Sequence, residues 1–97
     1  MGRRKGELST WSIDKGWPHQ VALPNKQVAS QRPAIVAFCS DLSLCIRGHT
    51  FVRDSQYVDV FCFSDPEHAQ RFSVEFGGEI IHPKDRPRWP GKPSRQR

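Results

Sequence analysis

Residues 56–81 constrain the fold of this chain more than any other segment, because they predict three consecutive elements. Residues 56–63 are rich in β-branched and aromatic side chains, which is typical of a strand. Ser64 and Asp65 then precede Pro66, and an oxygen-bearing side chain followed by proline is a signal for the start of a helix. A strand is therefore expected to run directly into a helix.

The helix expected to begin at Pro66 has an apolar face and a defined end. Gly77 follows the helix, and we expect it to adopt the left-handed conformation that is common after helix ends. Residues 79–82 predict a short strand, which Pro83 ends. The helix face itself is given by side chains at the spacing i, i+3, i+4, i+7, namely Ala69, Phe72, Ser73 and Phe76.

The chain before residue 56 predicts two further strands and one more helix. Residues 46–53 join residues 56–63 through the short turn Asp54–Ser55, which favours a β-hairpin. A helix is expected to begin near Arg32–Pro33, and residues 17–23 predict a strand before it. The apolar stripe of that helix consists of Ile35, Phe38, Cys39 and Leu42.

This order predicts an α+β fold, the ferredoxin-like βαββαβ plait, with an antiparallel sheet and two helices on one of its faces. Residues 10–82 form the predicted domain. Within it, residues 10–15 are either an extra N-terminal strand or an arm that carries Trp11 and Ile13. Residues 1–9 are expected to be a disordered basic N-terminus, and residues 83–97 a disordered, basic, proline-rich tail.

The net charge of +5 is concentrated in these predicted tails. Residues 7–82 carry six basic and nine acidic side chains, which gives that part a net charge of −3. Basic tails bind anions, including nucleic acid, weakly and without specificity. Weak nucleic-acid binding through the tails is therefore one expected interaction.

Several classes of function lack their sequence signatures. The N-terminal residues have no apolar core of a secretory signal, and no apolar run is long enough to span a membrane, so we expect a cytoplasmic protein of bacterial style with reduced cysteines and no membrane partner. Cys39, Cys45 and His49 lack the close cysteine pair of a zinc site. Cys45, His49 and Asp41 could form a Cys–His–Asp set, but no motif specifies that geometry. We predict no catalytic residue, no cofactor and no metal ligand, and hence no enzyme.

Residues 56–78 resemble the second half of an RNA-recognition motif, in which the third strand also leads through an acidic cap into a helix. The matching residues run from Phe63 to Ala69. The resemblance implies a ferredoxin-like plait. It does not imply the stacking of RNA bases, because the family's two exposed aromatic positions fall on Val58 and Val60.

Alternation along residues 56–63 assigns the side chains to two sheet faces. Phe61 and Phe63 are expected in the core beneath the helices. Val58, Val60 and Cys62 point to the opposite face, named here the Val60 face, which the predicted plait leaves open. An open apolar face needs a cover. Three covers are considered: the N-terminal arm, a second copy of the chain in a homodimer, or a ligand.

The neighbouring strand is expected to contribute a basic stripe to the Val60 face, because the opposite placement would bury two arginines at a high free-energy cost. The predicted partner or nucleic-acid surface consists of Arg47, His49, Phe51, Arg53, Val58 and Val60. The expected function is a small, non-enzymatic, intracellular binding or regulatory module that uses this face for self-association or for a partner. The alternative is a nucleic-acid-binding accessory protein that uses its tails and the basic stripe.

Overall fold

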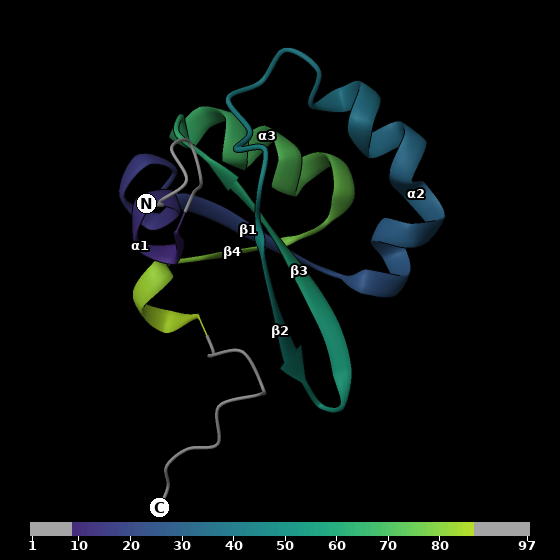
Figure 1. The fold of residues 1–97 in the computed structure, drawn as a ribbon. Helices are drawn as coiled ribbons and strands as arrows, with labels where there is room; N and C mark the ends of the chain where they lie inside the picture. Colours follow the sequence, from purple (N-terminus) through teal and green to yellow (C-terminus); the bar gives the residue numbers. More distant parts are fainter. Residues whose placement is uncertain (1–8, 87–97) are drawn as a thin grey trace, which may run out of the picture.

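A computed structural model describes residues 9–86 and shows an α+β fold, with a four-stranded antiparallel sheet and three α-helices (Figure 1). The strand order across the sheet is β2-β3-β1-β4. One helix precedes the first strand, and a short 3-10 helix follows the last. The elements are α1 (Thr10–Gly16), β1 (His19–Pro24), α2 (Asn25–Phe38), β2 (His49–Arg53), β3 (Gln56–Phe63), α3 (Pro66–Phe76), β4 (Glu79–Ile81) and η1 (Pro83–Asp85).

The segment from β3 to β4 follows its prediction closely. The strand ends at Phe63 and the helix begins at Pro66, as the sequence predicts. Asp65 caps the helix, because its side chain accepts a hydrogen bond from the backbone N–H of Glu67 at 2.9 Å. Gly77 follows the helix with φ of 77°, the left-handed conformation expected there. Local capping signals therefore fix both ends of α3.

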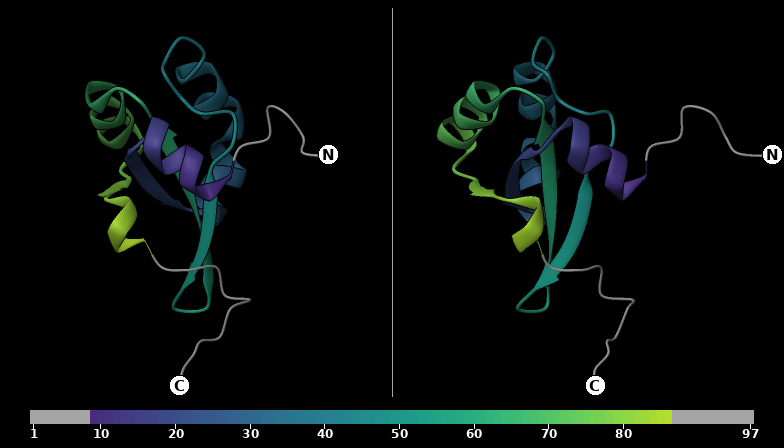
Figure 2. Two further views of the ribbon diagram at one scale, coloured as in Figure 1. Left: turned by 60° about the vertical axis from the view of Figure 1, so that its left-hand side comes forward. Right: turned by 90° about the vertical axis from the view of Figure 1, so that its left-hand side faces the viewer.

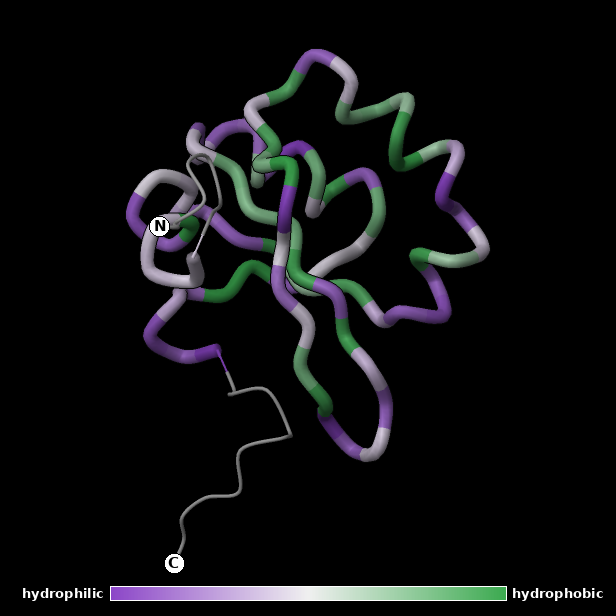
Figure 3. The backbone as a smooth tube through the Cα atoms, viewed as in Figure 1, coloured by the Kyte–Doolittle hydropathy of each residue, from purple (hydrophilic) through white to green (hydrophobic). Residues whose placement is uncertain are grey.

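One face of the sheet packs against α2 and α3 and forms the larger part of the core. Phe61 and Phe63 of β3 lie on this face, as predicted, together with Val21 and Leu23 of β1. Phe72 of α3 is fully buried at its centre. Figure 3 shows hydrophobic residues along the central strands, whereas the hairpin turn and η1 are hydrophilic.

The opposite, Val60 face is covered by α1. Ile13 of this helix is 3% exposed and packs with Val58, Val60 and Cys62. Figure 2 shows α1 and η1 on the same side of the sheet, both facing the viewer in its right-hand view. The N-terminal arm, one of the three covers considered from the sequence, therefore lies on this face. Trp11 is not part of the contact, since it is 68% exposed.

The N-terminal segment is a helix, and the prediction of an extra strand there is wrong. Ser9 caps this helix by accepting a hydrogen bond from the backbone N–H of Ser12 at 3.1 Å. Trp11, Ile13 and Lys15 alternate with polar residues, which suggested a strand, but six residues are too few to separate a strand period from a helix period.

The helix α2 begins at Asn25, earlier than the predicted start near Arg32. Its backbone leaves helical geometry at Gln31, where φ is −113° and ψ is 18°. Pro33 lies just after this kink, and a proline inside a helix removes one backbone hydrogen bond and clashes with the preceding turn. The sequence pattern predicts a helix start at Pro33, whereas this residue lies at a kink inside a longer helix.

The strand β2 begins at His49, later than the predicted start at residue 46, because a bulge precedes it. Leu44 pairs with Phe63, and His49 pairs with Val60, so residues 46–48 lie opposite Phe61 alone. Gly48 is required in this bulge, since a Cβ atom there would lie 2.2 Å from the carbonyl oxygen of Val60. The strand β1 also starts later than predicted, at His19.

Candidate functional site

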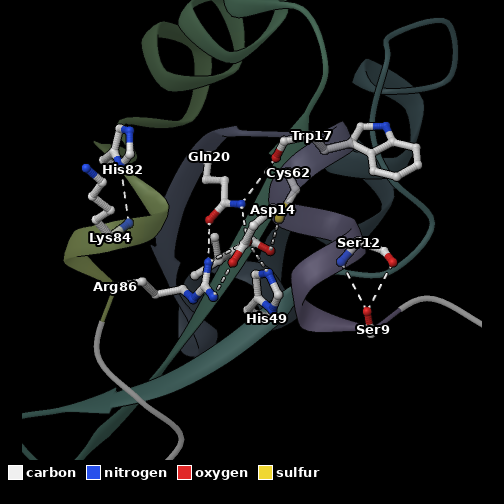
Figure 4. A network of polar contacts seen from close by, with 11 residues as sticks. Ser9, Ser12, Asp14, Trp17, Gln20, His49, Cys62, His82, Lys84 and Arg86 are labelled. Atoms are coloured by element: carbon white, nitrogen blue, oxygen red, sulfur yellow. Dashed lines mark hydrogen bonds and ion pairs between the residues drawn. The ribbon is translucent and has the colours of Figure 1, made fainter.

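Four polar side chains from distant parts of the chain meet on the α1 side of the sheet (Figure 4). Asp14 comes from α1, Gln20 from β1, His49 from β2, and Arg86 directly follows η1. We call this group the Asp14 cluster. Gln20 is fully buried, and the side chains of His49 and Arg86 are 10% and 11% exposed.

The Asp14 carboxylate is the centre of the cluster and accepts four hydrogen bonds. Arg86 donates two of them in a forked arrangement, from Nη1 to Oδ1 at 2.9 Å and from Nη2 to Oδ2 at 3.0 Å. Gln20 Nε2 lies 2.8 Å and His49 Nε2 lies 3.0 Å from Oδ1. The carboxylate is thus paired with a cation and surrounded by donors.

Gln20 connects the other members of the cluster and has its own hydrogen-bonding groups satisfied. Its Oε1 accepts from Arg86 Nη1 at 2.8 Å, and its Nε2 also donates to the carbonyl oxygen of Trp17 at 3.2 Å. Because a buried amide without partners is costly, these contacts explain why a polar residue is stable in this central strand.

The charges of the cluster follow from its geometry. Burial raises the pKa of Asp14, but hydrogen bonds from Arg86 and Gln20, together with the charge of Arg86, outweigh burial and lower the pKa to about 2. Burial and the charge of Arg86 lower the pKa of His49 below its usual 6.5. A neutral His49 beside an ionised carboxylate carries its proton on Nε2, so Nδ1 keeps its lone pair.

These pKa shifts predict that the protein becomes less stable as the pH falls. The folded pKa of Asp14 lies below the unfolded value of 3.8, so its contribution is complete above pH 4 and is lost as the pH approaches 2. With allowance for solvent screening of a side chain that is 23% exposed, this loss is about 1–2 kcal/mol. The lowered pKa of His49 adds a loss that begins below pH 6.5.

Urea unfolding at pH values from 2 to 8 measures this dependence. Asp14→Asn should remove the step between pH 4 and 2, and His49→Gln should remove the step below pH 6.5. An unfolding free energy of the wild-type protein that stays constant from pH 7 to pH 3 would show that neither group is linked to folding in this way.

The cluster is built to hold elements together. Asp14 is poorly suited to act as a general base, because Oδ1 receives three donors, Arg86 also donates to Oδ2, and the charge of Arg86 stabilises the ionised carboxylate. Its contacts join α1, β1, β2 and the segment after η1. The cluster therefore fixes α1 and the C-terminal segment to the Val60 face.

A pocket of about 280 Å³ lies beside the cluster, at the bulge before β2. His49 belongs to both the pocket and the Asp14 cluster. Cys45 and Cys62 line one part of the pocket, and Arg32 of α2 and Asp59 of β3 line another. Its lining also includes Ile46 and Gly48, which are exposed residues of the bulge.

The six residues predicted as a partner surface do not form one exposed surface in this structure. Phe51, Val58 and Val60 are 0%, 8% and 2% exposed. All three belong to the buried group that includes Ile13 of α1, on the face that was expected to be open. The physical reason is that packing of α1 on this face removes apolar surface from water, which lowers the free energy.

The basic members of that predicted surface lie in three different settings. His49 belongs to the Asp14 cluster. Arg53 donates a hydrogen bond to Glu79 at 2.9 Å, and its guanidinium carbon lies 5.2 Å from the centre of the Phe51 ring. Arg47 is exposed in the bulge. The expected basic stripe is therefore divided between a buried cluster, an ion pair and one exposed arginine.

Sequence reasoning missed Asp14, Gln20 and Arg86 as members of a site. The one local signal is Gln20, a polar residue next to the apolar run of β1. Arg86 was assigned to the tail. The structure brings Asp14, and not the exposed Asp41, to His49, so the Cys–His–Asp set with Asp41 is not formed.

The cysteines of the chain are buried and free. Burial raises the pKa of Cys39 to about 11, and burial together with the neighbouring Cys45 raises the pKa of Cys62 to about 12. Both thiols therefore stay protonated at neutral pH. Among residues 9–86, no group of three or more His, Cys, Asp or Glu side chains is arranged to hold a metal ion.

The comparisons with known proteins and the search for membrane-spanning helices do not assign this chain to a family or a functional class. The chain matches no family model, no curated protein and no solved structure. No helix within residues 9–86 has the length and apolar character needed to cross a bilayer.

Proposed function

We propose that the protein is a non-enzymatic, intracellular binding module of the ferredoxin-like class, and that its Val60 face receives a second copy of the chain in exchange for α1. The class assignment is supported by the part that follows α1, which runs β-α-β-β-α-β with the sheet order β2-β3-β1-β4. The non-enzymatic assignment is supported by the pairing of the Asp14 carboxylate with Arg86 and by the high pKa of the Cys62 thiol.

The observation that carries this proposal is the small cover over a broad apolar face. Ile13 is the one buried residue of α1, and Trp17 adds a partly buried ring. Burial of one isoleucine contributes about 1.5–3 kcal/mol. A helix of seven residues is not stable in isolation, so α1 depends on this contact and on the Asp14 cluster. An apolar surface of another molecule can compete with such a cover.

The sheet edges are less suited to association than the Val60 face. The edge strand β4 has three residues, which is too short for an extended ladder. The other edge strand, β2, follows a bulge and ends at the charged Arg53. Bulges, short strands and charges are the features that prevent strand addition at an edge.

Sedimentation of the full chain over a wide concentration range tests the proposal. Ile13→Asp should release α1 from the face and increase the dimer fraction at a given concentration. Trp11→Asp is the matched control, because Trp11 lies on the same helix but is exposed, and it should leave the fraction unchanged. Circular dichroism confirms that both variants stay folded. A folded Ile13→Asp variant that remains monomeric at high concentration would contradict self-association.

Nucleic-acid binding is the second candidate function, and the exposure of Arg47 supports it. Arg47 is exposed in the bulge and has no partner among the described residues, whereas Arg53 is paired with Glu79. The basic residues of the two tails lie outside the described residues, apart from Lys84 and Arg86. Titration with DNA and RNA at two salt concentrations should show a steep salt dependence that Arg47→Glu reduces. Binding that the Arg47→Glu variant retains unchanged would assign it to the tails alone.

A further inference from the structure

Two of the three cysteines are neighbours on adjacent segments of the sheet. Leu44 pairs with Phe63 in an antiparallel bridge, which places Cys45 directly opposite Cys62. The backbone N–H of Cys45 donates to the carbonyl oxygen of Cys62 at 2.8 Å. Both side chains belong to the same buried group of residues beneath α1. Register, backbone hydrogen bonding and burial thus agree that the two thiols share one face of the sheet.

The spacing of such a pair suits a disulfide. Opposed residues in an antiparallel ladder have Cα atoms about 4.5–5.5 Å apart, and disulfides join Cα atoms about 4.4–6.8 Å apart. Cys39 is different, because it belongs to the separate core between the helices and the other sheet face. The chain therefore contains one thiol pair and one isolated thiol.

The pocket beside the Asp14 cluster extends to both residues of this pair. Cys45 and Cys62 both line the pocket, although they are 4% and 0% exposed on the protein surface. Its volume of about 280 Å³ admits a molecule as small as hydrogen peroxide. Cys45 lies next to the bulge, which contributes the exposed residues Ile46 and Gly48 to the lining of the pocket.

We propose that Cys45 and Cys62 are a reversible redox site, which hydrogen peroxide converts into an intramolecular disulfide. The sulfur of Cys45 attacks one peroxide oxygen, the O–O bond breaks, and the thiol proton leaves with the released hydroxide as water. The sulfur of Cys62 then attacks the resulting sulfenic acid, the S–O bond breaks, and a second water carries away the Cys62 proton. The two thiols lose two electrons in total, and one peroxide is reduced to two waters.

The order of the two thiols follows from their surroundings. Cys62 is fully buried, and its thiol remains protonated at neutral pH, so it is a poor first nucleophile. Cys45 is 4% exposed and directly precedes the exposed residues of the bulge, so it reacts first. The disulfide would join the segment before the bulge to the central strand β3, and it would restrict opening of the pocket. This inference is independent of the proposed self-association.

Peroxide treatment of the full chain, followed by alkylation of the remaining thiols and peptide mapping without reductant, tests the proposal. The expected product is a monomer with a Cys45–Cys62 cross-link, a mass lower by two hydrogen atoms, and a Cys39 that is alkylated after denaturation. Dithiothreitol should restore three thiols. Cys39→Ser is the matched control and should form the same cross-link to the same extent.

A second variant separates the two chemical steps. Cys62→Ala should leave the sulfenic acid on Cys45, where dimedone traps it, and Cys62→Ser serves as a replacement if the alanine variant does not fold. A cross-link that involves Cys39, cross-links only between molecules, or three unmodified thiols under conditions that oxidise a free cysteine peptide would each overturn the proposal.

Discussion

Replacing Arg86 with methionine is expected to lower the free energy of unfolding by about 3–5 kcal/mol, because it leaves the Asp14 carboxylate in its partly buried site without a cation. Methionine keeps the apolar length of the side chain and removes both hydrogen bonds to Asp14 as well as the one to Gln20. Urea unfolding followed by circular dichroism measures the loss.

Arg53→Met is the matched control for this substitution. Arg53 also donates to a carboxylate at 2.9 Å, but its side chain and that of Glu79 are 45% and 58% exposed. Exposed ion pairs contribute about 0.2–1 kcal/mol, so the control should change stability by less than 1 kcal/mol. Equal losses in the two variants would show that burial of the Asp14 cluster does not determine its contribution.

The double variant Asp14→Leu, Arg86→Met distinguishes the value of the pair from the cost of breaking it. Buried ion pairs can often be replaced by apolar side chains with little loss, whereas an orphaned charge is costly. The double variant should therefore be more stable than Arg86→Met alone. A double variant that is less stable than Arg86→Met would indicate that the network has a net stabilising effect beyond charge compensation.

The elements that the sequence predicted well are those fixed by short-range signals. The Asp65–Pro66 start and the Gly77 end of α3 depend on side chains within a few residues of each boundary. The strand β3 has a strict alternation that assigns Phe61 to one face and Val60 to the other, and both assignments are confirmed. Such signals need no knowledge of the distant chain.

The Asp14 cluster could not be predicted in the same way. Its members are separated by up to 72 residues, and no spacing rule links Asp14 with Arg86. Asp14 reaches the cluster because residues 10–16 form a helix. The sequence of this short segment is compatible with a strand as well, so it does not predict that position. Arg86 lies in a stretch of proline and basic residues that gives no core signal. Tertiary contacts, and not local sequence, decide both positions.

The bulge before β2 could be predicted only in part from the sequence. Gly48 within a strand-like run indicates a bulge or a close backbone approach, so part of the signal was present. The number of residues in the bulge depends on the register with β3, which the sequence does not contain. The pocket at the bulge was therefore not predictable, although Cys45 and His49 at its wall had been considered together as candidate chemistry.

Phe72→Ala should have the largest effect on stability of any single apolar substitution in α3, with a loss of about 3–5 kcal/mol. Phe72 is fully buried, and its ring centre lies 5.0 Å from that of Phe61 and 5.0 Å from that of Phe76. The rings of Phe63 and Phe38 lie 5.3 Å and 6.2 Å away. Alanine would leave a cavity among four aromatic rings that cannot all move into it.

Such a loss is large for a domain of this size, because small domains bury a low fraction of their surface and native proteins are stable by about 5–15 kcal/mol. We expect Phe72→Ala to be partly unfolded at 37 °C, with a urea midpoint far below that of the wild-type protein. Val74→Ala on the same helix is the control, since Val74 is 74% exposed and its truncation should change stability by about 0.5 kcal/mol or less. If the free energies of unfolding of Phe72→Ala and Val74→Ala differ by less than 1 kcal/mol, the core between α3 and the sheet is not the main source of stability. The packing of α1 on the Val60 face would then be the main source.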